Sequence, residues 1–342
     1  MIKKNIFTLM ALISLCTVQA AAEPTKYPFT IENCGHSLRF AKSPKRVVSI
    51  GQNETETLYY LGLGDKVKAT AFWFTPPLPQ FVALNAKIPQ ISRNSPSFES
   101  VIHYQPDFVT NQYETVIGEG HGATGTYDQF NAFHIPVYTN PSICRARLAM
   151  DRSIKAHKQN AFSMKDIYQE VSDLAAIFNV NERGVELIKN MQAREDKLRA
   201  IAKNWPKGEI SAFVWYSSTV AKLEPTVAGR TSSPQYIFDI LGIKNIITVD
   251  QDWPTASWEY IAKQNPTLII LADTSVLKRP FNKVEDKLTY LHTDPVAKTM
   301  DAVVNNRILI MDSQALSNSI RTLDGLETIA NTLIKMKLVP TP

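Results

Sequence analysis

A short motif occurs twice in this chain, and its repetition constrains the fold more than any other sequence feature. The first copy, SFESVIHYQPDFV, begins at Ser97, and the second, SWEYIAKQNPTLI, begins at Ser257. In each copy a glutamate follows the serine, a helical pattern leads to a proline, and an apolar β-type run comes next. A helix followed by a strand is one unit of an α/β fold. The repetition therefore predicts two similar α/β lobes.

Short β-branched runs alternate with helical patterns along the rest of the chain, in two series. Strands that alternate with helices predict mainly parallel sheets, so we expect an α/β fold with two Rossmann-like lobes and a ligand cleft between them. The predicted strands are 45–50, 66–71, 107–111 and 135–139 in the first series, and 209–217, 245–249, 267–272 and 307–311 in the second.

A long amphipathic helix is predicted between the two series, over 181–204. Its end is indicated by Pro206 and Gly208. We expect an N-terminal lobe at 23–180, a linking helix at 181–204 and a C-terminal lobe at 205–342. A single helix is a stiff connection, so we expect little hinge closure. The apolar residues at helical spacing are Val185, Ile188, Met191, Leu198 and Ile201.

The first residues, 1–22, have the pattern of a cleavable secretory signal peptide. Lys3 and Lys4 precede an apolar run that is too short for a membrane helix, and small residues lead to Glu23. We therefore expect a mature protein that is exported to the periplasm and soluble. A lipoprotein interpretation would use Cys16, but Leu15 is bulky where a small residue is required.

Charge and cysteine content narrow the functional classes. The formal net charge is +5, and Lys3 and Lys4 leave with the signal peptide, so the balance gives no indication of nucleic-acid binding. Loss of Cys16 leaves Cys34 and Cys144. An even pair in an oxidising compartment is a disulfide candidate, and the alternative is two buried free thiols.

Three further motifs near the start of the chain, together with two in its second half, form a recognisable combination. Basic residues follow Pro44 before the first strand, a Thr55-Glu56 pair opens the first helix, and a Leu-Gly-Leu-Gly turn occupies 61–64. SSPQYIFDILGIKNII from Ser232 and NNRILIMD from Asn305 extend the pattern into the second half. This combination resembles the helical-backbone class of periplasmic substrate-binding proteins, which serve ABC importers of ferric siderophores, haem and vitamin B12.

The resemblance implies a binding protein that is not an enzyme, needs no cofactor and acts as a monomer. Its ligand would be an iron chelate, with a ferric siderophore as the leading candidate. Haem, cobalamin or another metal chelate are the alternatives within this class. An exported enzyme or sensor on the same scaffold is the alternative of another class, because a fold does not fix a function.

The resemblance also gives the repeated glutamates a role. In this family one exposed glutamate near a helix start in each lobe inserts into an arginine-lined pocket of the dimeric inner-membrane permease, which works with an ATPase. The matching positions are Glu99 and Glu259. A carboxylate in the first helical turn is favoured by the helix dipole and can bind arginine in a bidentate manner. The alternative is that each glutamate only stabilises its own helix.

Candidate ligand contacts lie in the segments that follow the predicted strands, because ligands of open α/β sheets bind beyond the carboxyl ends of the strands. Aromatic rings offer flat apolar contact, and arginine matches planar anionic oxygens. The alternatives are core packing for the aromatic residues and salt bridges for the arginines, and we expect Phe74 to belong to the core. The candidates are Trp73, Tyr113, Trp215, Tyr216, Arg230, Trp253 and Arg321.

Neither a metal site nor a catalytic motif stands out in the sequence. The six histidines are scattered, and no Walker A, Gly-x-Ser-x-Gly or His-Glu-x-x-His motif is present. The glycine-rich stretch GEGHGATG from Gly118 lacks the context of a dinucleotide site, so we expect a loop at the mouth of the cleft. We expect no resident metal, and direct ligation by Tyr113, Glu114 or His121 is the alternative.

Overall fold

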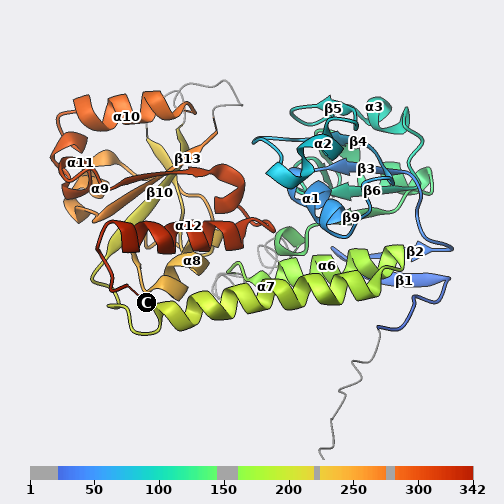
Figure 1. Cartoon of the computed structure of the whole chain (residues 1–342). Helices are drawn as coiled ribbons and strands as arrows, with labels where there is room; N and C mark the ends of the chain where they lie inside the picture. The colour runs from blue at the N-terminus through green and yellow to red at the C-terminus, as the bar shows by residue number, and fades with distance from the viewer. Residues whose placement is uncertain (1–21, 145–160, 219–223, 275–281, 342) are drawn as a thin grey trace, which may run out of the picture.

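Two α/β lobes lie side by side, with one long helix extending along both of them (Figure 1). The computed structural model describes residues 22–144, 161–218, 224–274 and 282–341. The predicted signal peptide therefore lies outside the described residues, apart from Ala22. Among the described residues, no helix combines the length and the apolar character needed to cross a membrane.

The N-terminal lobe is built on a five-stranded sheet with the order β5-β4-β3-β6-β9. Every neighbouring pair in this sheet is parallel. A parallel sheet is covered on both faces, and alternate residues of one strand accordingly enter different cores: Val47 packs with Leu58 on one face, and Val48 packs with Val109 on the other. The strands are β3 (Val47–Ile50), β4 (Val67–Ala71), β5 (Gln90–Ser92), β6 (Phe108–Asn111) and β9 (Val137–Thr139).

Helices and two small sheets surround this sheet. The antiparallel pair of β1 and β2 lies at the N-terminus, and the short β7–β8 pair follows β6 in the chain. The bounds are β1 (Phe29–Asn33), β2 (His36–Phe40), β7 (Ile117–Gly118), β8 (Gly125–Thr126), α1 (Gln52–Tyr60), η1 (Pro79–Phe81), α2 (Val82–Asn85), α3 (Phe98–Ile102) and α4 (Tyr127–Ala132).

The C-terminal lobe repeats the plan, with the strand order β11-β10-β13-β14 and β12 paired to β10. Only the β10–β11 pairing among the described strands of this sheet is antiparallel, so the sheet is mainly parallel, as predicted. The predicted strand 245–249 is shorter in the structure, where β12 covers only Lys244–Asn245. The other strands are β10 (Ser211–Ser218), β11 (Pro225–Val227), β13 (Leu268–Asp273) and β14 (Ile308–Asp312).

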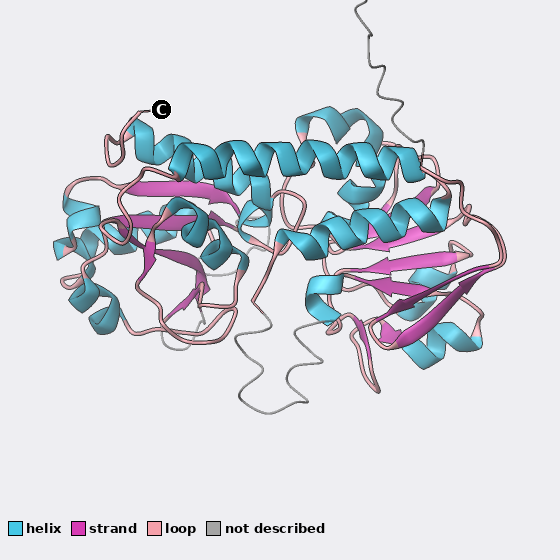
Figure 2. Cartoon of the chain, turned by 90° about the horizontal axis from the view of Figure 1, so that it is seen from below, coloured by secondary structure: helices cyan, strands magenta, loops and turns pink. Residues whose placement is uncertain are grey.

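The helices of the C-terminal lobe lie on both faces of its sheet (Figures 1 and 2). Alternate residues of β10 again face different cores, with Val214 in one cluster and Phe213 in the other. The helices are α8 (Ser233–Leu241), α9 (Trp258–Gln264), α10 (Val284–Thr293), η4 (Ala297–Thr299), α11 (Asp301–Val304), η5 (Ser313–Leu316) and α12 (Thr322–Lys335).

The connection between the lobes consists of α7 (Asn181–Ala202) with α6 (Met164–Phe178) packed against it. The predicted long helix is therefore present, and a second helix runs beside it. The two helices approach closely at Gly184, where a Cβ atom would lie 2.5 Å from the Cβ of Ala175. Further along, α7 contacts α8 and α12 of the C-terminal lobe. Figure 2 shows α7 reaching over both groups of strands.

Candidate functional site

A cleft of about 430 Å³ lies between the lobes and receives side chains from both. Its walls combine aromatic rings with a few polar groups, which is the usual composition of a small-molecule site. The lining residues are Phe72, Phe74, Tyr113, Thr115 and Ile143 from the N-terminal lobe, and Tyr216, Asp252, Trp253, Ser317 and Asn318 from the C-terminal lobe.

The N-terminal wall is formed where two parallel strands end. Phe72 follows the last residue of β4 and has a positive φ of 59°, and Tyr113 comes two residues after the end of β6. The ring centroid of Phe72 lies 4.5 Å from that of Phe74 and 5.5 Å from that of Tyr113. The location beyond the carboxyl ends of the strands agrees with the expectation for open α/β sheets.

The C-terminal wall depends on an irregularity in β10. The pairing of β10 with β11 shifts register between Trp215 and Ser217. Tyr216 faces the cleft, and its ring centroid lies 4.6 Å from that of Trp253. Its hydroxyl group lies 3.4 Å from the hydroxyl oxygen of Ser317. Burial raises the pKa of both Tyr113 and Tyr216, so both phenols are neutral at ordinary pH.

A buried lysine holds the end of β10 in place. The ammonium group of Lys287, from α10, donates hydrogen bonds to the carbonyl oxygens of Tyr216 and Ala272, each at 2.7 Å, and to that of Trp215 at 3.3 Å. Burial lowers the pKa of Lys287 to about 7. The lysine therefore ties β10 to β13 directly behind the cleft residue Tyr216.

Two of the predicted ligand contacts, Trp73 and Trp215, are core residues in this structure. Trp215 is 1% exposed, and its ring centroid lies 4.8 Å from that of Trp258 inside the C-terminal lobe. Trp73 is 6% exposed and donates its indole N–H to the carbonyl oxygen of Thr75. Phe74 is the opposite case, because it lines the cleft although we expected it in the core. The predictions for Tyr113, Tyr216 and Trp253 agree with the lining of the cleft.

The two predicted arginines are already paired within the protein. Arg321 is 4% exposed, binds the carboxylates of Glu56 and Asp312, and donates to the carbonyl oxygen of Pro76 at 2.8 Å. Because Glu56 belongs to α1 of the N-terminal lobe, this side chain bridges the lobes. Arg230 is exposed and forms an ion pair with Asp250 at 2.6 Å.

Phe74 also lines a second cavity. It measures about 510 Å³ and borders the Arg321 network. Its remaining lining is largely aliphatic, and it comes from the proline-rich segment after Thr75 and from the ends of β13 and β14. The lining residues are Phe74, Thr75, Pro76, Pro77, Leu78, Pro79, Asp273, Ile310, Met311, Asp312 and Arg321.

Asp252 is a cleft residue that the sequence argument missed. Its carboxylate accepts a hydrogen bond from the hydroxyl group of Thr231, and burial raises its pKa. Trp253 was selected because it lies in a segment that follows a predicted strand, and Asp252 lies in the same segment. An acidic residue was not expected there, because aromatic and basic side chains are the ones that match an anionic chelate.

Two buried glutamates lie behind the N-terminal wall. The side-chain amide of Asn53 donates to Glu54 at 3.1 Å and to Glu170 at 2.8 Å, and that of Asn140 donates to Glu54 at 3.1 Å. Burial raises the pKa of Glu54 to about 7 and raises that of Glu170 as well, and the two carboxylates disfavour each other's ionisation. The Asn53 oxygen also accepts a hydrogen bond at 2.7 Å from the backbone N–H of Ile320 in the C-terminal lobe.

The repeated motif has the same local geometry in both lobes. The hydroxyl oxygen of Ser97 accepts a hydrogen bond from the backbone N–H of Ser100, and that of Ser257 accepts one from Tyr260, each at 3.2 Å. These contacts cap the first turns of α3 and α9. Glu99 and Glu259 each stand in the first turn and are exposed.

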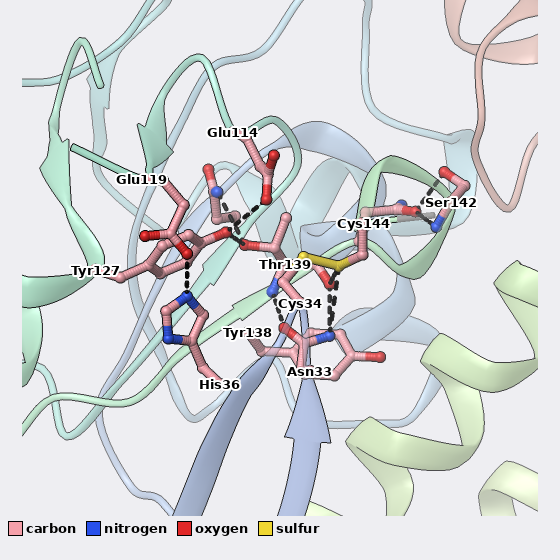
Figure 3. Close-up of a disulfide and its surroundings, with 12 residues drawn as sticks. Asn33, Cys34, His36, Glu114, Glu119, Tyr127, Tyr138, Thr139, Ser142 and Cys144 are labelled. Atoms are coloured by element: carbon pink, nitrogen blue, oxygen red, sulfur yellow. Dashed lines mark hydrogen bonds and ion pairs between the residues drawn. A yellow bond between two sulfur atoms is a disulfide. The ribbon is translucent and has the colours of Figure 1, made fainter. Parts of the chain in front are cut away.

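A disulfide joins the β1–β2 turn to the segment after β9 (Figure 3). Cys34 and Cys144 are bonded, with their Cα atoms 4.9 Å apart. Beside them, the amide group of Asn33 exchanges two hydrogen bonds with the backbone of Thr139, at 2.7 and 2.8 Å. The disulfide and these hydrogen bonds attach the N-terminal hairpin to the sheet.

The residues considered as direct metal ligands occupy different surroundings. Tyr113 lines the cleft, the carboxylate of Glu114 accepts a hydrogen bond from Tyr127 at 3.4 Å, and His121 is exposed. Nearby, Glu119 pairs with His36 at 2.8 Å (Figure 3). Within the described ranges, no three or more histidine, cysteine, aspartate or glutamate side chains are grouped so that they could hold a metal ion.

Comparisons with known proteins agree on one family. Residues 47–315 match the sequence profile of the periplasmic binding protein family. The uncharacterized ABC transporter substrate-binding lipoprotein YvrC of Bacillus subtilis is 22% identical over 315 residues, which are 90% of this chain and 86% of that protein.

Solved structures show the same fold. A structure described as an ABC-type Fe3+-hydroxamate transport system from Saccharomonospora viridis superposes with a TM-score of 0.72 at 22% identity, covering 90% of this chain and 99% of that one. A periplasmic haem-binding protein from Pseudomonas aeruginosa gives a TM-score of 0.64 at 18% identity, covering 87% and 94%.

Proposed function

The chain belongs to the periplasmic binding protein family, and from this premise we propose that it captures an iron chelate between its lobes and delivers it to an ABC importer of the inner membrane. Members of this family bind substrates and do not transform them, so the chain is a binding protein and not an enzyme. We further propose that it acts in the periplasm as a monomer, after removal of residues 1–22.

The cleft between the lobes is the observation that carries the capture step. Five aromatic side chains from two lobes surround a volume of about 430 Å³, which suits a ligand with a large apolar surface. The relatives described as Fe3+-hydroxamate and haem-binding proteins support an iron chelate. A ferric siderophore is our first candidate. Haem is the second, because opposed aromatic rings can stack on a planar macrocycle.

A fluorescence titration tests the capture step. The mature protein, residues 23–342, would be titrated with a ferric trihydroxamate that carries a terminal ammonium group, a ferric catecholate, haem and vitamin B12. We expect one of them to quench tryptophan fluorescence with a Kd below about 10 μM, or roughly 7 kcal/mol. Trp253→Phe should remove most of the quench, whereas Trp205→Phe, a change in the core of the C-terminal lobe, should retain it. If none of the three iron chelates binds, the proposal is wrong, even if vitamin B12 binds.

The matched helix starts at Ser97 and Ser257 support the delivery step. Each lobe presents one exposed carboxylate in a capped first turn, so the two lobes offer a symmetric partner the same group. We propose that Glu99 and Glu259 bind arginine side chains of a dimeric permease, with charge-assisted and often bidentate contacts. The permease would work with its ATPase.

Charge reversal separates delivery from capture. A cell that carries Glu99→Arg and Glu259→Arg together should lose chelate uptake, while the purified variant binds the chelate with unchanged affinity. The control reverses two exposed glutamates on α7, with Glu182→Arg and Glu186→Arg, and should leave uptake intact. Normal uptake by the first variant would show that these glutamates only stabilise their own helices.

A further inference from the structure

The charge inside the cleft differs from the one expected for an anionic ligand. Its ionisable carboxylate belongs to Asp252, and the polar side chains around it, Thr115, Ser317 and Asn318, are neutral. Among the described lining residues, a chelate would therefore meet one carboxylate and no basic side chain. Both predicted arginines, Arg230 and Arg321, are engaged elsewhere.

The position of Asp252 is fixed by its neighbours. Its backbone carbonyl oxygen accepts a hydrogen bond from Gly229 at 2.9 Å, and one carboxylate oxygen, Oδ1, accepts the hydroxyl hydrogen of Thr231. These contacts leave the second carboxylate oxygen, Oδ2, available to a ligand. Within the ranges that the structure describes, no basic side chain forms an ion pair with Asp252. Asp250, two residues earlier, is by contrast paired with Arg230 at 2.6 Å.

Aromatic rings from both lobes line the same cleft as this carboxylate. Trp253 and Tyr216 form one pair, with ring centroids 4.6 Å apart, and Phe72 lies 5.5 Å from Tyr113 on the facing wall. The faces of such rings attract cations, and a carboxylate beside them adds a charge-assisted hydrogen bond. A carboxylate and aromatic faces in one cleft are the chemistry that recognises an ammonium group.

We propose that Asp252 is a specificity-determining residue that selects chelates carrying an ammonium group. The carboxylate would bind the ammonium group while the rings contact the apolar body of the chelate. This inference rests on the proposed function and deepens it by naming the substrate class: a ferric hydroxamate with a free amine, in preference to a polyanionic catecholate complex.

Two chelates that differ only in this group provide the test. Ferrioxamine B is a ferric trihydroxamate with one terminal ammonium group, and N-acetylation turns that group into a neutral amide. In calorimetric titrations the mature protein should bind the ammonium form at least about tenfold more tightly, which corresponds to about 1.4 kcal/mol. The Asp252→Asn variant should bind the two forms equally, through weaker binding of the ammonium form. Asp252→Glu should recover part of the preference.

Asp250→Asn is the matched control, because it removes a carboxylate two residues away that lies outside the lining of the cleft. This variant should keep the preference. Equal binding of both chelates by the unmodified protein would overturn the inference and leave the proposed function standing. The inference is overturned in the same way if only other ferric chelates bind, or if Asp252→Asn weakens both forms alike. Failure of every iron chelate to bind would overturn the proposed function and the inference with it.

Discussion

Replacing Arg321 with methionine should destabilise the protein more than replacing its partner Glu56 with glutamine. Glu56 is 1% exposed, and beyond Arg321 its carboxylate accepts a hydrogen bond from the backbone N–H of Leu78, at 3.3 Å. Arg321 has a second carboxylate partner in Asp312, which is 34% exposed. The loss of Arg321 therefore leaves the Glu56 carboxylate buried without an ionic partner. The loss of the Glu56 charge leaves Arg321 paired with Asp312.

The magnitudes follow from this asymmetry. Burial is the largest influence on Glu56 and raises its pKa even though Arg321 opposes the shift. Removing one partner of a buried ion pair costs about 3–5 kcal/mol, and we expect Arg321→Met in that range. Glu56→Gln removes one charge-assisted contact and should cost about 1.5–3 kcal/mol. The double variant Glu56→Gln with Arg321→Met should cost less than the sum of the two single losses, because no charge of the pair remains buried alone.

Urea unfolding at pH 7 measures these differences, with the free energy of unfolding extrapolated to water. Arg230→Met is the matched control, since it breaks an exposed, solvent-screened ion pair with Asp250 and should leave the free energy of unfolding nearly unchanged. Equal losses for Arg321→Met and Glu56→Gln would refute the asymmetry argument. Additive losses in the double variant would refute the coupling across the lobes.

Two further predictions concern stability. Changing Cys34 and Cys144 together to serine should cost about 4–5 kcal/mol, because the bond closes a loop with a sequence separation of 110, and an unchanged urea midpoint would contradict this. The pKa of Glu54 is about 7 when folded against an ordinary value of 4.5, so the folded state binds more protons between these values. Stability should therefore fall through this group as the pH rises from about 4.5 to 7. Glu54→Gln should flatten that fall in melting temperatures, and an unaltered pH profile would count against it.

The architecture was predictable because its evidence is local and repeated. The alternation of apolar runs and helical patterns, together with the copies at Ser97 and Ser257, specified two mainly parallel α/β lobes. Short edge strands such as β5 and β11 escaped prediction, because three residues carry too little pattern.

The site was less predictable because its composition depends on single-residue steps and distant partners. Trp215 and Tyr216 are adjacent, yet one is in the core and the other faces the cleft, since neighbouring side chains of a strand point to opposite faces. Arg321 forms an ion pair with Glu56, a residue far away in the sequence, and no local sequence pattern reveals that pairing.

The long helix α7 also bears on how the chain tolerates insertions. A loop absorbs an extra residue, but a residue added inside a helix turns everything beyond it by about 100° and advances it by roughly 1.5 Å. Because α7 packs on α6 near one end and on α8 and α12 near the other, such a rotation would turn the contacting side chains at one end away from their partners. The length of α7 therefore fixes both the distance between the two lobes and their relative orientation. The spacing of Glu99 and Glu259, one on each lobe, depends on both.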